Sequence, residues 1–340
     1  MTDTIPTTQH RHAADDEPLL SVRDLTVTFQ RSGDEPFVAV DGVSFELRPG
    51  DTLGIVGESG SGKSVTSLAI MGLLPRRGVR VEGEVFYNGV DLLTLSDSQM
   101  RDRRGAELGM IFQDPLSSLN PVVPIGVQVT EVLERHRGLS RKASTPLARE
   151  MLDRVGIPDP DRRLKDYPHQ LSGGMRQRAL IAMALAAQPR VLIADEPTTA
   201  LDVTIQAQIL AVLKDLVEDT GTALIMITHD LGVVAGLVDT VNVMYAGRVV
   251  ERADRHPLFA QPRHPYTAGL LASIPRLDSS RGERLTPIPG SVADNLPWTS
   301  ACAFAPRCSQ PISTCLEQTP QLVDDGDRAL RCFNPMEDTR

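Results

Sequence analysis

The fold of this chain follows from one stretch near its start, Gly57-Glu58-Ser59-Gly60-Ser61-Gly62-Lys63-Ser64. It matches the pattern G-x-x-x-x-G-K-S, in which backbone N–H groups surround nucleotide phosphates, the lysine reaches the β- and γ-phosphates and the last hydroxyl ligates Mg²⁺. The apolar run 53–56 before it indicates a strand, and residues 65–74 after it indicate a helix ending before Pro75. This order predicts a nucleotide-binding α/β domain, because the helix N-terminus adds its positive end to the anion site.

A second glycine-rich stretch precedes another helical run, 175–187. It reads Leu171-Ser172-Gly173-Gly174-Met175-Arg176-Gln177-Arg178, so its backbone N–H groups also suit a phosphate. A chain that binds one nucleotide rarely needs two such loops. We therefore expect the second loop to serve the ATP that a partner subunit holds.

Together the two stretches resemble the ATP-binding cassette (ABC) family, whose signature loop reads LSGGQ. The fifth residue here is Met175, a departure that occurs in the oligopeptide-importer branch. The resemblance implies an α/β fold: an ABC-type P-loop NTPase core with an antiparallel β subdomain, a helical subdomain and a C-terminal Cys-containing extension. It also implies that Ser172, Gly173 and Gly174 contact the ATP of a second cassette.

Two carboxylates, Asp195 and Glu196, follow the apolar run 191–194, which is typical of a buried parallel strand. Such a pair is ordinarily the start of a solvated loop, and only the order of the motifs favours a functional role. By resemblance, Asp195 is the Walker B residue that holds Mg²⁺ through its water shell. Glu196 is then the catalytic base or the residue that positions the attacking water.

Four further positions match the family's motif order. His229 matches the switch histidine that bonds the γ-phosphate, and Gln113 matches the Q-loop glutamine that touches Mg²⁺ and the attacking water. Ala200-Leu201-Asp202 matches the D-loop, which crosses the cassette interface and brings Asp202 toward the nucleotide. Phe29 matches the aromatic that stacks on adenine, although an alternating strand would bury this side chain anyway.

Composition limits the class of protein. The chain has 340 residues, 35 Lys and Arg against 44 Asp and Glu (net charge −9), and 4% aromatic residues, without a basic block or an aromatic platform for nucleic acid. No uninterrupted apolar stretch approaches the roughly 18 residues needed to cross a bilayer, and the first residues lack the pattern of a secretory signal. We expect a soluble cytosolic protein that reaches the membrane only through a partner.

The chain divides into three predicted regions. Residues 1–17 are rich in Thr, His, Asp, Glu, Pro and Ala and predict a disordered tail. Residues 18–255 form the predicted ATPase domain, in which alternating apolar residues from Leu20 onward predict antiparallel strands with a one-residue slip near Arg23-Asp24. Residues 256–340 form the predicted C-terminal extension.

The predicted helical subdomain spans about 114–170, between the Q-loop and the signature. Within it, Leu147, Met151, Leu152 and Val155 are spaced as on one helix face. The sequence predicts that this helix has Pro146 at its first position and ends at Gly156. Its place in the chain implies that the subdomain passes motion to a partner.

All four cysteines lie in the extension: Cys302, Cys308, Cys315 and Cys332. The stretch Cys302-Ala303-Phe304-Ala305-Pro306-Arg307-Cys308 resembles the C-x-F-x-x-R-C element of oligopeptide and dipeptide importer ATPases. That family often has glycine where this chain has Ala301. The resemblance therefore covers both halves of the chain.

The cysteines are not expected to form disulfides, because the cytosol keeps thiols reduced. Gaps of five, six and sixteen residues lack the closely paired cysteines of structural zinc sites. They permit a Cys₄ iron–sulfur cluster, and the resemblance implies a 4Fe–4S cluster because some members of this branch bind one; zinc and free thiols remain as alternatives. Since the cysteines are far in sequence from every nucleotide motif, we expect them to fold the tail against a partner.

The leading hypothesis is the ATP-hydrolysing subunit of an ABC importer for peptides or similar small solutes, peripheral on the cytoplasmic face of the cell membrane. The resemblance implies ATP and Mg²⁺ as ligands. It also implies a second, paralogous ATPase subunit, two integral-membrane permease subunits and an extracytoplasmic solute-binding protein as partners, and no nucleic acid. One rival is a soluble mechanical ABC ATPase, which usually has two cassettes or a long coiled-coil insertion. The other is a redox-sensing regulator, which the set Asp195, Glu196 and His229 argues against. The sequence does not identify the transported solute.

Overall fold

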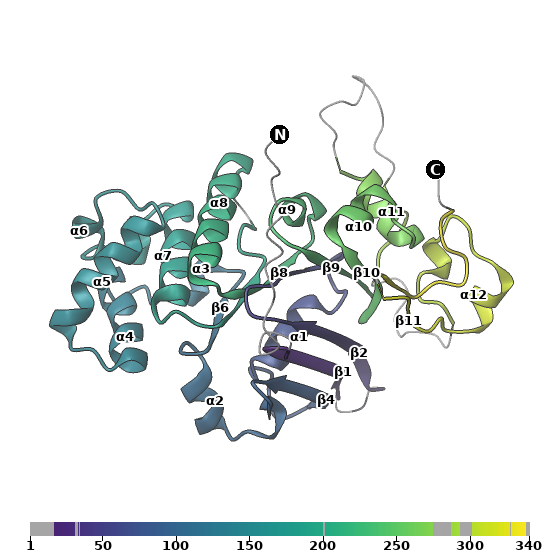
Figure 1. The fold of residues 1–340 in the computed structure, drawn as a ribbon, viewed down its shortest axis with the longest axis horizontal. Helices are drawn as coiled ribbons and strands as arrows, with labels where there is room; N and C mark the ends of the chain where they lie inside the picture. Colours follow the sequence, from purple (N-terminus) through teal and green to yellow (C-terminus); the bar gives the residue numbers. More distant parts are fainter. Residues whose placement is uncertain are drawn as a thin grey trace, which may run out of the picture.

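The computed structural model describes residues 17–337 apart from 31–32, 34, 200, 275–286, 293–300 and 327. The predicted disordered tail, except Glu17, lies outside the described residues. In Figure 1 two sheets occupy the middle of the molecule, most helices of the 114–220 segment lie to one side, and the C-terminal elements lie to the other. Among the described helices, none combines the length and the hydropathy that a bilayer crossing requires.

The smaller sheet is antiparallel, with strand order β2-β1-β4-β5. Its strands are β1 (Leu20–Phe29), β2 (Phe37–Leu47), β4 (Val79–Tyr87) and β5 (Val90–Asp91). The pairing of β1 with β2 is continuous to Val22 and resumes at Leu25, and Asp24 between them has a φ of 48°. The antiparallel strands and the slip near Asp24 are thereby confirmed, and the slip is a β-bulge.

The larger sheet has eight strands in the order β11-β12-β10-β9-β3-β8-β7-β6. A central group runs parallel: β3 (Thr52–Val56), β6 (Leu108–Ile111), β7 (Val191–Asp195), β8 (Ala223–Thr228) and β9 (Thr240–Tyr245). Every residue of β7 and β8 is buried, as their apolar sequences predict. The carboxyl ends of these strands lie at one edge of the sheet, where open α/β sheets bind ligands.

The helices of the nucleotide-binding core are α1 (Lys63–Ile70), α2 (Asp97–Arg103), α7 (Gly173–Ala186), α8 (Val203–Thr220) and α9 (Leu231–Ala235), with a 3₁₀ turn at Leu92–Thr94. The predicted span 65–74 for α1 is wrong at both ends. The helix starts at Lys63, and it stops well before Pro75 because Gly72 adopts a left-handed φ of 60°.

The segment 114–170 contains α3 (Pro115–Ser118), α4 (Ile125–Arg137), α5 (Arg141–Arg154), α6 (Pro160–Arg163) and a 3₁₀ turn at Pro168–Gln170. The prediction that Pro146 opens a helix is wrong: α5 starts at Arg141, and Pro146 lies inside it. The side chain of Ser140 accepts a hydrogen bond from Ala143 N and sets the earlier start. The helix ends before Gly156, which has a φ of 73°, as predicted.

The C-terminal region contains α10 (Arg255–Ala260), α11 (Pro265–Ala272), a 3₁₀ turn at Ala305–Arg307, α12 (Ser313–Glu317), β11 (Val323–Asp324) and β12 (Arg328–Leu330). Strand β12 pairs antiparallel with β10 (Arg248–Asp254), so the extension continues the large sheet of the core (Figure 1). The sequence analysis, which divides the chain into an ATPase domain at 18–255 and an extension at 256–340, does not predict this pairing. Short strands separated by long irregular stretches carry little periodic signal.

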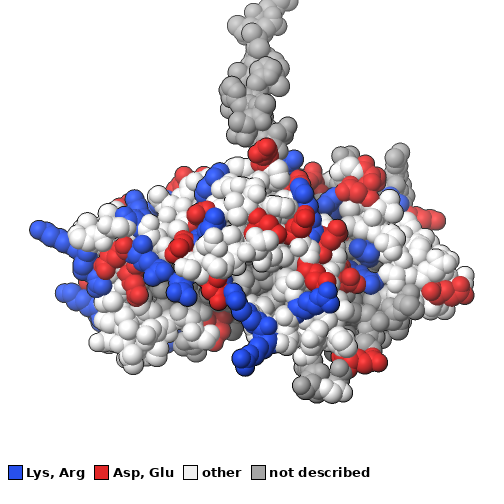
Figure 2. Space-filling view, turned by 90° about the horizontal axis from the view of Figure 1, so that it is seen from below, with Lys and Arg blue, Asp and Glu red and all other residues white. Residues whose placement is uncertain are grey.

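Charged residues of both signs are interspersed over the face shown in Figure 2. Exposed ion pairs of the chain include Arg149 with Asp161 and Arg80 with Glu82. Such exposed pairs each contribute about 0–1 kcal/mol to the free energy of unfolding. The surface charge therefore says little about how the fold is stabilised.

Candidate nucleotide site

The predicted site residues of the parallel strands meet at one sheet edge. The phosphate loop follows β3, Gln113 follows β6, Asp195 ends β7 with Glu196 directly after it, and His229 follows β8. These four strands are neighbours in the order β3-β8-β7-β6. Adjacent parallel strands therefore bring together residues that are far apart in the sequence.

The phosphate loop depends on two close backbone approaches. A Cβ on Gly57 would lie 2.2 Å from Met244 O, and one on Gly62 would lie 2.6 Å from Ala39 O. Gly62 also has a φ of 100°, which favours glycine, and α1 begins after it without a side-chain cap. The first N–H groups of α1 therefore suit an anion better than a helix start whose own side chain occupies them.

Lys63 is enclosed by the loop, with 4% of its surface exposed. Its Nζ donates to Gly57 O at 2.7 Å and to Glu58 O at 2.9 Å. Burial lowers the pKa of Lys63, while the carboxylates of Glu196 and Asp195 oppose that change. An ammonium group held here by neutral carbonyls gains a stronger partner when a phosphate enters.

Ser64 and Asp195, two of the three residues predicted to hold Mg²⁺, are in contact. Ser64 Oγ donates to Asp195 Oδ1 at 2.9 Å, and Asp195 is 5% exposed. Burial raises the pKa of Asp195, and the hydrogen bond from Ser64 opposes that increase. A hydroxyl and a carboxylate placed together fit Mg²⁺, which takes oxygen ligands and few carboxylates.

The predicted catalytic residues converge on one carboxylate oxygen. Glu196 Oε2 accepts from Gln113 Nε2 at 2.8 Å and lies 3.3 Å from His229 Nδ1. Thr199 Oγ1 also donates to this oxygen, at 2.9 Å. The sequence analysis does not predict a role for Thr199. Its place three residues after Glu196, in a turn with two threonines, could have indicated a local hydrogen bond to that carboxylate.

Glu196 has a strained backbone, with a φ of 46° in the left-handed region. Its N–H donates to Ile227 O at 2.8 Å, so strand β8 holds it in this conformation. Non-glycine residues are held in this region at functional sites more often than elsewhere. The backbone and the three side-chain contacts thus fix the direction of this carboxylate.

The signature loop forms a second, separate group. Ser172 Oγ caps α7 by accepting from Met175 N at 3.3 Å, and Ser172 and Gly173 are exposed. Gly174 packs against α8, where a Cβ would lie 2.8 Å from Ile205 Cγ2. Asp202 caps α8 by accepting from the N–H groups of residues 204 and 205. Ala200, predicted within the D-loop, lies outside the described residues.

Phe29 is the last residue of β1, opposite Phe37 of β2 and Val79 of β4. Its side chain is partly buried against the core of the antiparallel sheet. A packed strand residue accounts for this position, and stacking on adenine stays a prediction.

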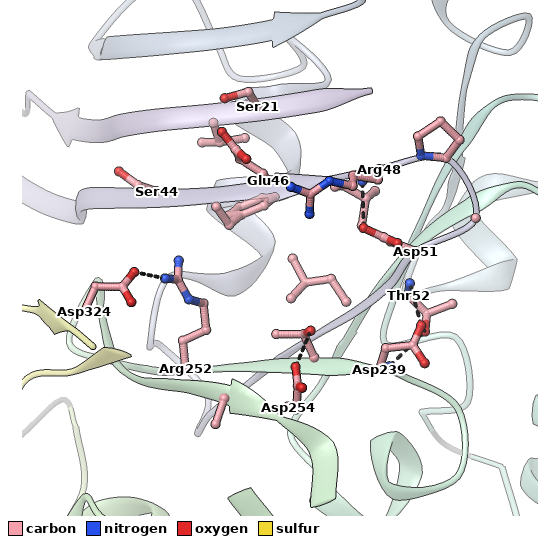
Figure 3. Close-up of a pocket in the computed structure, with 18 of the residues that line it drawn as sticks. Ser21, Ser44, Glu46, Arg48, Asp51, Thr52, Asp239, Arg252, Asp254 and Asp324 are labelled. Atoms are coloured by element: carbon pink, nitrogen blue, oxygen red, sulfur yellow. Dashed lines mark hydrogen bonds and ion pairs between the residues drawn. The ribbon is translucent and has the colours of Figure 1, made fainter. Parts of the chain in front are cut away.

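A cavity of about 1030 Å³ lies away from this site (Figure 3). Thr52 lines it at the amino end of β3, whereas the phosphate loop follows the carboxyl end of that strand. Two of its charged residues have partners in the lining: Arg252 pairs with Asp324, and Asp239 accepts from Thr52 N and Oγ1. The predicted site residues do not line it.

The four cysteines line one small pocket of about 10 Å³ together with His264 and Phe304. All four are free thiols, and burial raises the pKa of Cys302 and Cys308, and that of Cys332 to about 11. Within the described ranges, however, no group of three or more His, Cys, Asp or Glu side chains is arranged to hold a metal ion. The structure brings the predicted ligands together without forming a metal site.

Residues 40–199 match the family model "ABC transporter", and residues 250–315 match "Oligopeptide/dipeptide transporter, C-terminal region". The oligopeptide transport ATP-binding protein OppD of Bacillus subtilis is 54% identical over 310 residues, covering 91% of this chain and 86% of that protein. The dipeptide transport ATP-binding protein DppD of the same organism is 51% identical, covering 93% and 95%.

Among solved structures, a dimeric post-hydrolysis form of the ATP-binding cassette MJ0796 bound to ADP and phosphate is similar. It has a TM-score of 0.62 and 30% identity, and covers 69% of this chain and 98% of that chain. A cbiO1 subunit of Clostridium perfringens, part of the transporter complex cbiONQ, has a TM-score of 0.60 and 27% identity, and covers 72% of this chain and 92% of that one.

Proposed function

The chain belongs to the ABC transporter family, in its oligopeptide and dipeptide branch, and on that premise we propose the roles of its residues and its partners. It is an ABC ATPase with the cassette fold, and it is the ATP-binding subunit of a peptide importer. The observation that carries the mechanism is the convergence of Gln113, Thr199 and His229 on Glu196, beside the phosphate loop.

In the proposed binding mode, the loop from Gly57 to Gly62 surrounds the phosphates and Lys63 exchanges its carbonyl partners for the β- and γ-phosphates. Ser64 and Asp195 would hold Mg²⁺, with Gln113 nearby. Bound there, the ion would supply positive charge that neutralises the charge developing on the transferred phosphoryl group. The existing contact between Ser64 and Asp195 supports this assignment.

Hydrolysis requires that Glu196 face the attacking water. Water oxygen bonds to the γ-phosphorus, the bond to the β–γ bridging oxygen breaks, and Glu196 accepts the water proton, giving ADP and phosphate. Because Gln113 and His229 now contact Glu196, each exchanges that partner when ATP binds. Gln113 then orients the water, and His229 donates to the γ-phosphate.

A second cassette completes the site. Ser172 caps α7, and Gly173 and Gly174 are the first residues of that helix. We propose that they bind the γ-phosphate held by a second, paralogous ATPase subunit, with Asp202 at the interface between the two. ATP binding closes the pair and hydrolysis opens it.

The pair would drive two integral-membrane permease subunits on the cytoplasmic face of the membrane, with an extracytoplasmic binding protein delivering the solute. The named functions of OppD and DppD support peptides as that solute. The match to the transporter C-terminal region disfavours both a soluble mechanical ATPase and a redox regulator.

A 4Fe–4S cluster on Cys302, Cys308, Cys315 and Cys332 is supported by donor chemistry alone, since four thiols lining one pocket match the ligand set of such a cluster. The described arrangement does not fit a metal ion as it stands. Binding would require the thiols to lose their protons and the pocket to widen.

Reconstitution tests the proposed function. The chain, co-expressed with its permeases and companion ATPase, is placed in proteoliposomes, and ATP hydrolysis is measured with the binding protein with and without peptide. We expect peptide to stimulate hydrolysis and to enter the vesicles. Hydrolysis without any peptide uptake would contradict the proposal.

A further inference from the structure

The phosphate loop is tied to the C-terminal extension. Arg307, from the C-x-F-x-x-R-C element, donates two hydrogen bonds to the Glu58 carboxylate, at 2.6 Å from Nη1 and 2.9 Å from Nη2. Glu58 is the second residue of the phosphate loop, 249 positions earlier in the sequence. A two-pronged arginine–carboxylate contact fixes the orientation of both partners.

Arg307 is anchored independently of Glu58. Its Nε donates to Pro289 O at 2.7 Å, and its Nη2 donates to Gly290 O at 3.1 Å. The guanidinium lies over the Tyr245 ring, 5.7 Å from its centroid, and only 3% of the side chain is exposed. The extension therefore presents a preset cation, against which the more exposed Glu58 is held.

A second tie acts on the loop backbone. Glu58 N donates to Tyr266 Oη at 2.8 Å. Edge-to-face contacts hold the Tyr266 ring against Tyr245 and Phe304, with centroids 4.7 Å and 5.4 Å away. Since Glu58 O accepts from Lys63 Nζ, the N–H, the carbonyl and the carboxylate of Glu58 are all engaged.

The ion pair between Arg307 and Glu58 also changes the charge that nucleotide phosphates meet at the loop. Glu58 is near enough to Lys63 to act on it electrostatically. An unpaired carboxylate at this place would repel nucleotide phosphates and compete for the lysine. Paired with Arg307, the same carboxylate is neutralised and turned toward the extension.

We propose that Arg307 and Tyr266 are positioning residues of the ATP site, which hold the phosphate loop in its binding shape and neutralise Glu58. Affinity for ATP then depends on the fold of the C-terminal extension. This inference rests on the proposed function, because it assumes that the phosphate loop binds ATP. It also gives the extension a role within its own chain, in contrast to the expected role against a partner.

The test compares two matched arginines. Arg328 also pairs with a glutamate, Glu251 at 3.3 Å, and also donates to two carbonyls, those of Gln261 and Pro257, but these acceptors lie outside the phosphate loop. Calorimetry measures the dissociation constant for ATP with Mg²⁺ on the full-length chain carrying Arg307→Gln or Arg328→Gln. The KM and kcat for ATP are measured in the assembled transporter, and the Tm reports folding.

Because Arg307→Gln removes a charge-assisted contact, we expect it to raise the dissociation constant and the KM for ATP about tenfold. The kcat at saturating ATP should change less than about threefold. Arg328→Gln should lower the Tm comparably and leave KM within about twofold. In a Glu58→Gln background, Arg307→Gln should raise KM less than about threefold, because the carboxylate it neutralises is gone. Equal KM increases in the two arginine variants, or an undiminished effect in the Glu58→Gln background, would overturn the proposal.

Tyr266→Phe keeps the ring packing and removes only the bond to Glu58 N, so it remains informative if Arg307→Gln does not fold. We expect about a threefold rise in KM, and an unchanged KM would overturn the role of Tyr266. A wild-type chain that binds no ATP would instead refute the proposed function. The two failures are therefore distinguishable.

Discussion

The phosphate loop and the signature loop are both glycine-rich and both precede a helix, but their surroundings differ. At the phosphate loop, Gly62 leaves the start of α1 without a side-chain cap, and Lys63 and Asp195 are buried beside it. At the signature loop, Ser172 caps α7 itself and the glycine that follows is exposed. The difference supports the proposal that the phosphate loop is equipped within its own chain, whereas the signature loop acts only when a second cassette faces it.

Among these substitutions, Lys63→Ala should lower turnover the most, and it should act only through the phosphate loop. The phosphates lose their buried positive partner, so we expect ATP binding to weaken and turnover to fall on the order of 100-fold or more. Binding is measured by calorimetry and turnover in the assembled transporter. Near-normal turnover would show that the phosphate loop is not the site equipped for ATP.

Glu196→Gln should separate binding from hydrolysis. The amide keeps the shape of the side chain but cannot accept the water proton, so hydrolysis should slow on the order of 100-fold or more while ATP binding persists. Rapid-quench assays give the rate, and light scattering shows whether ATP traps a closed cassette pair. A wild-type rate would mean that Glu196 is not the catalytic carboxylate.

Gly173→Asp should affect only the ATP site of the facing cassette. A Cβ at this position meets just Leu201 Cδ2 at 3.6 Å, and an aspartate suits a helix N-terminus, so we expect normal folding. The new carboxylate would repel the phosphate of the facing site, lowering transporter turnover about tenfold with unchanged ATP affinity in the isolated chain. Gly173→Ala is the control and should retain most turnover. If Gly173→Asp weakens ATP binding to the isolated chain, the two loops are not separate.

The cysteines should have the smallest effect on ATP affinity. Protein purified without oxygen should be brown and contain iron and sulfide, and Cys315→Ser should remove the colour. Since Arg307 is also anchored by Pro289 and Gly290, the dissociation constant for ATP should rise less than in Arg307→Gln. Colourless wild-type protein with one zinc per chain, or with no metal, would rule out the cluster.

The sequence predicted the parts of the site that rest on local pattern. Apolar runs located β3, β7 and β8, and the residues after them meet because parallel strands end at one edge. The sequence misplaced the end of α1 and the start of α5. Helix α1 ends before Gly72 and not at Pro75, and α5 starts after Ser140 and not at Pro146.

The sequence could not reveal the contact between Arg307 and Glu58. The two residues lie in motifs that look like independent modules, and their meeting depends on where β12 and α11 place the extension against the core. Long-range packing of this kind carries no periodic signal. The expected role of the extension against a partner therefore stays a prediction, and its contact with the phosphate loop is an addition that the sequence did not indicate.

In the proposed cassette pair, one ATP lies between the phosphate loop of one cassette and the signature loop of the other. In the assembled transporter trapped with ADP, Mg²⁺ and vanadate, ultraviolet light cleaves backbone next to the bound vanadate, and mass spectrometry locates the cuts in this chain. We expect cuts in both loops, near Ser61 and near Ser172. Cleavage near Ser61 with an intact signature loop would contradict it.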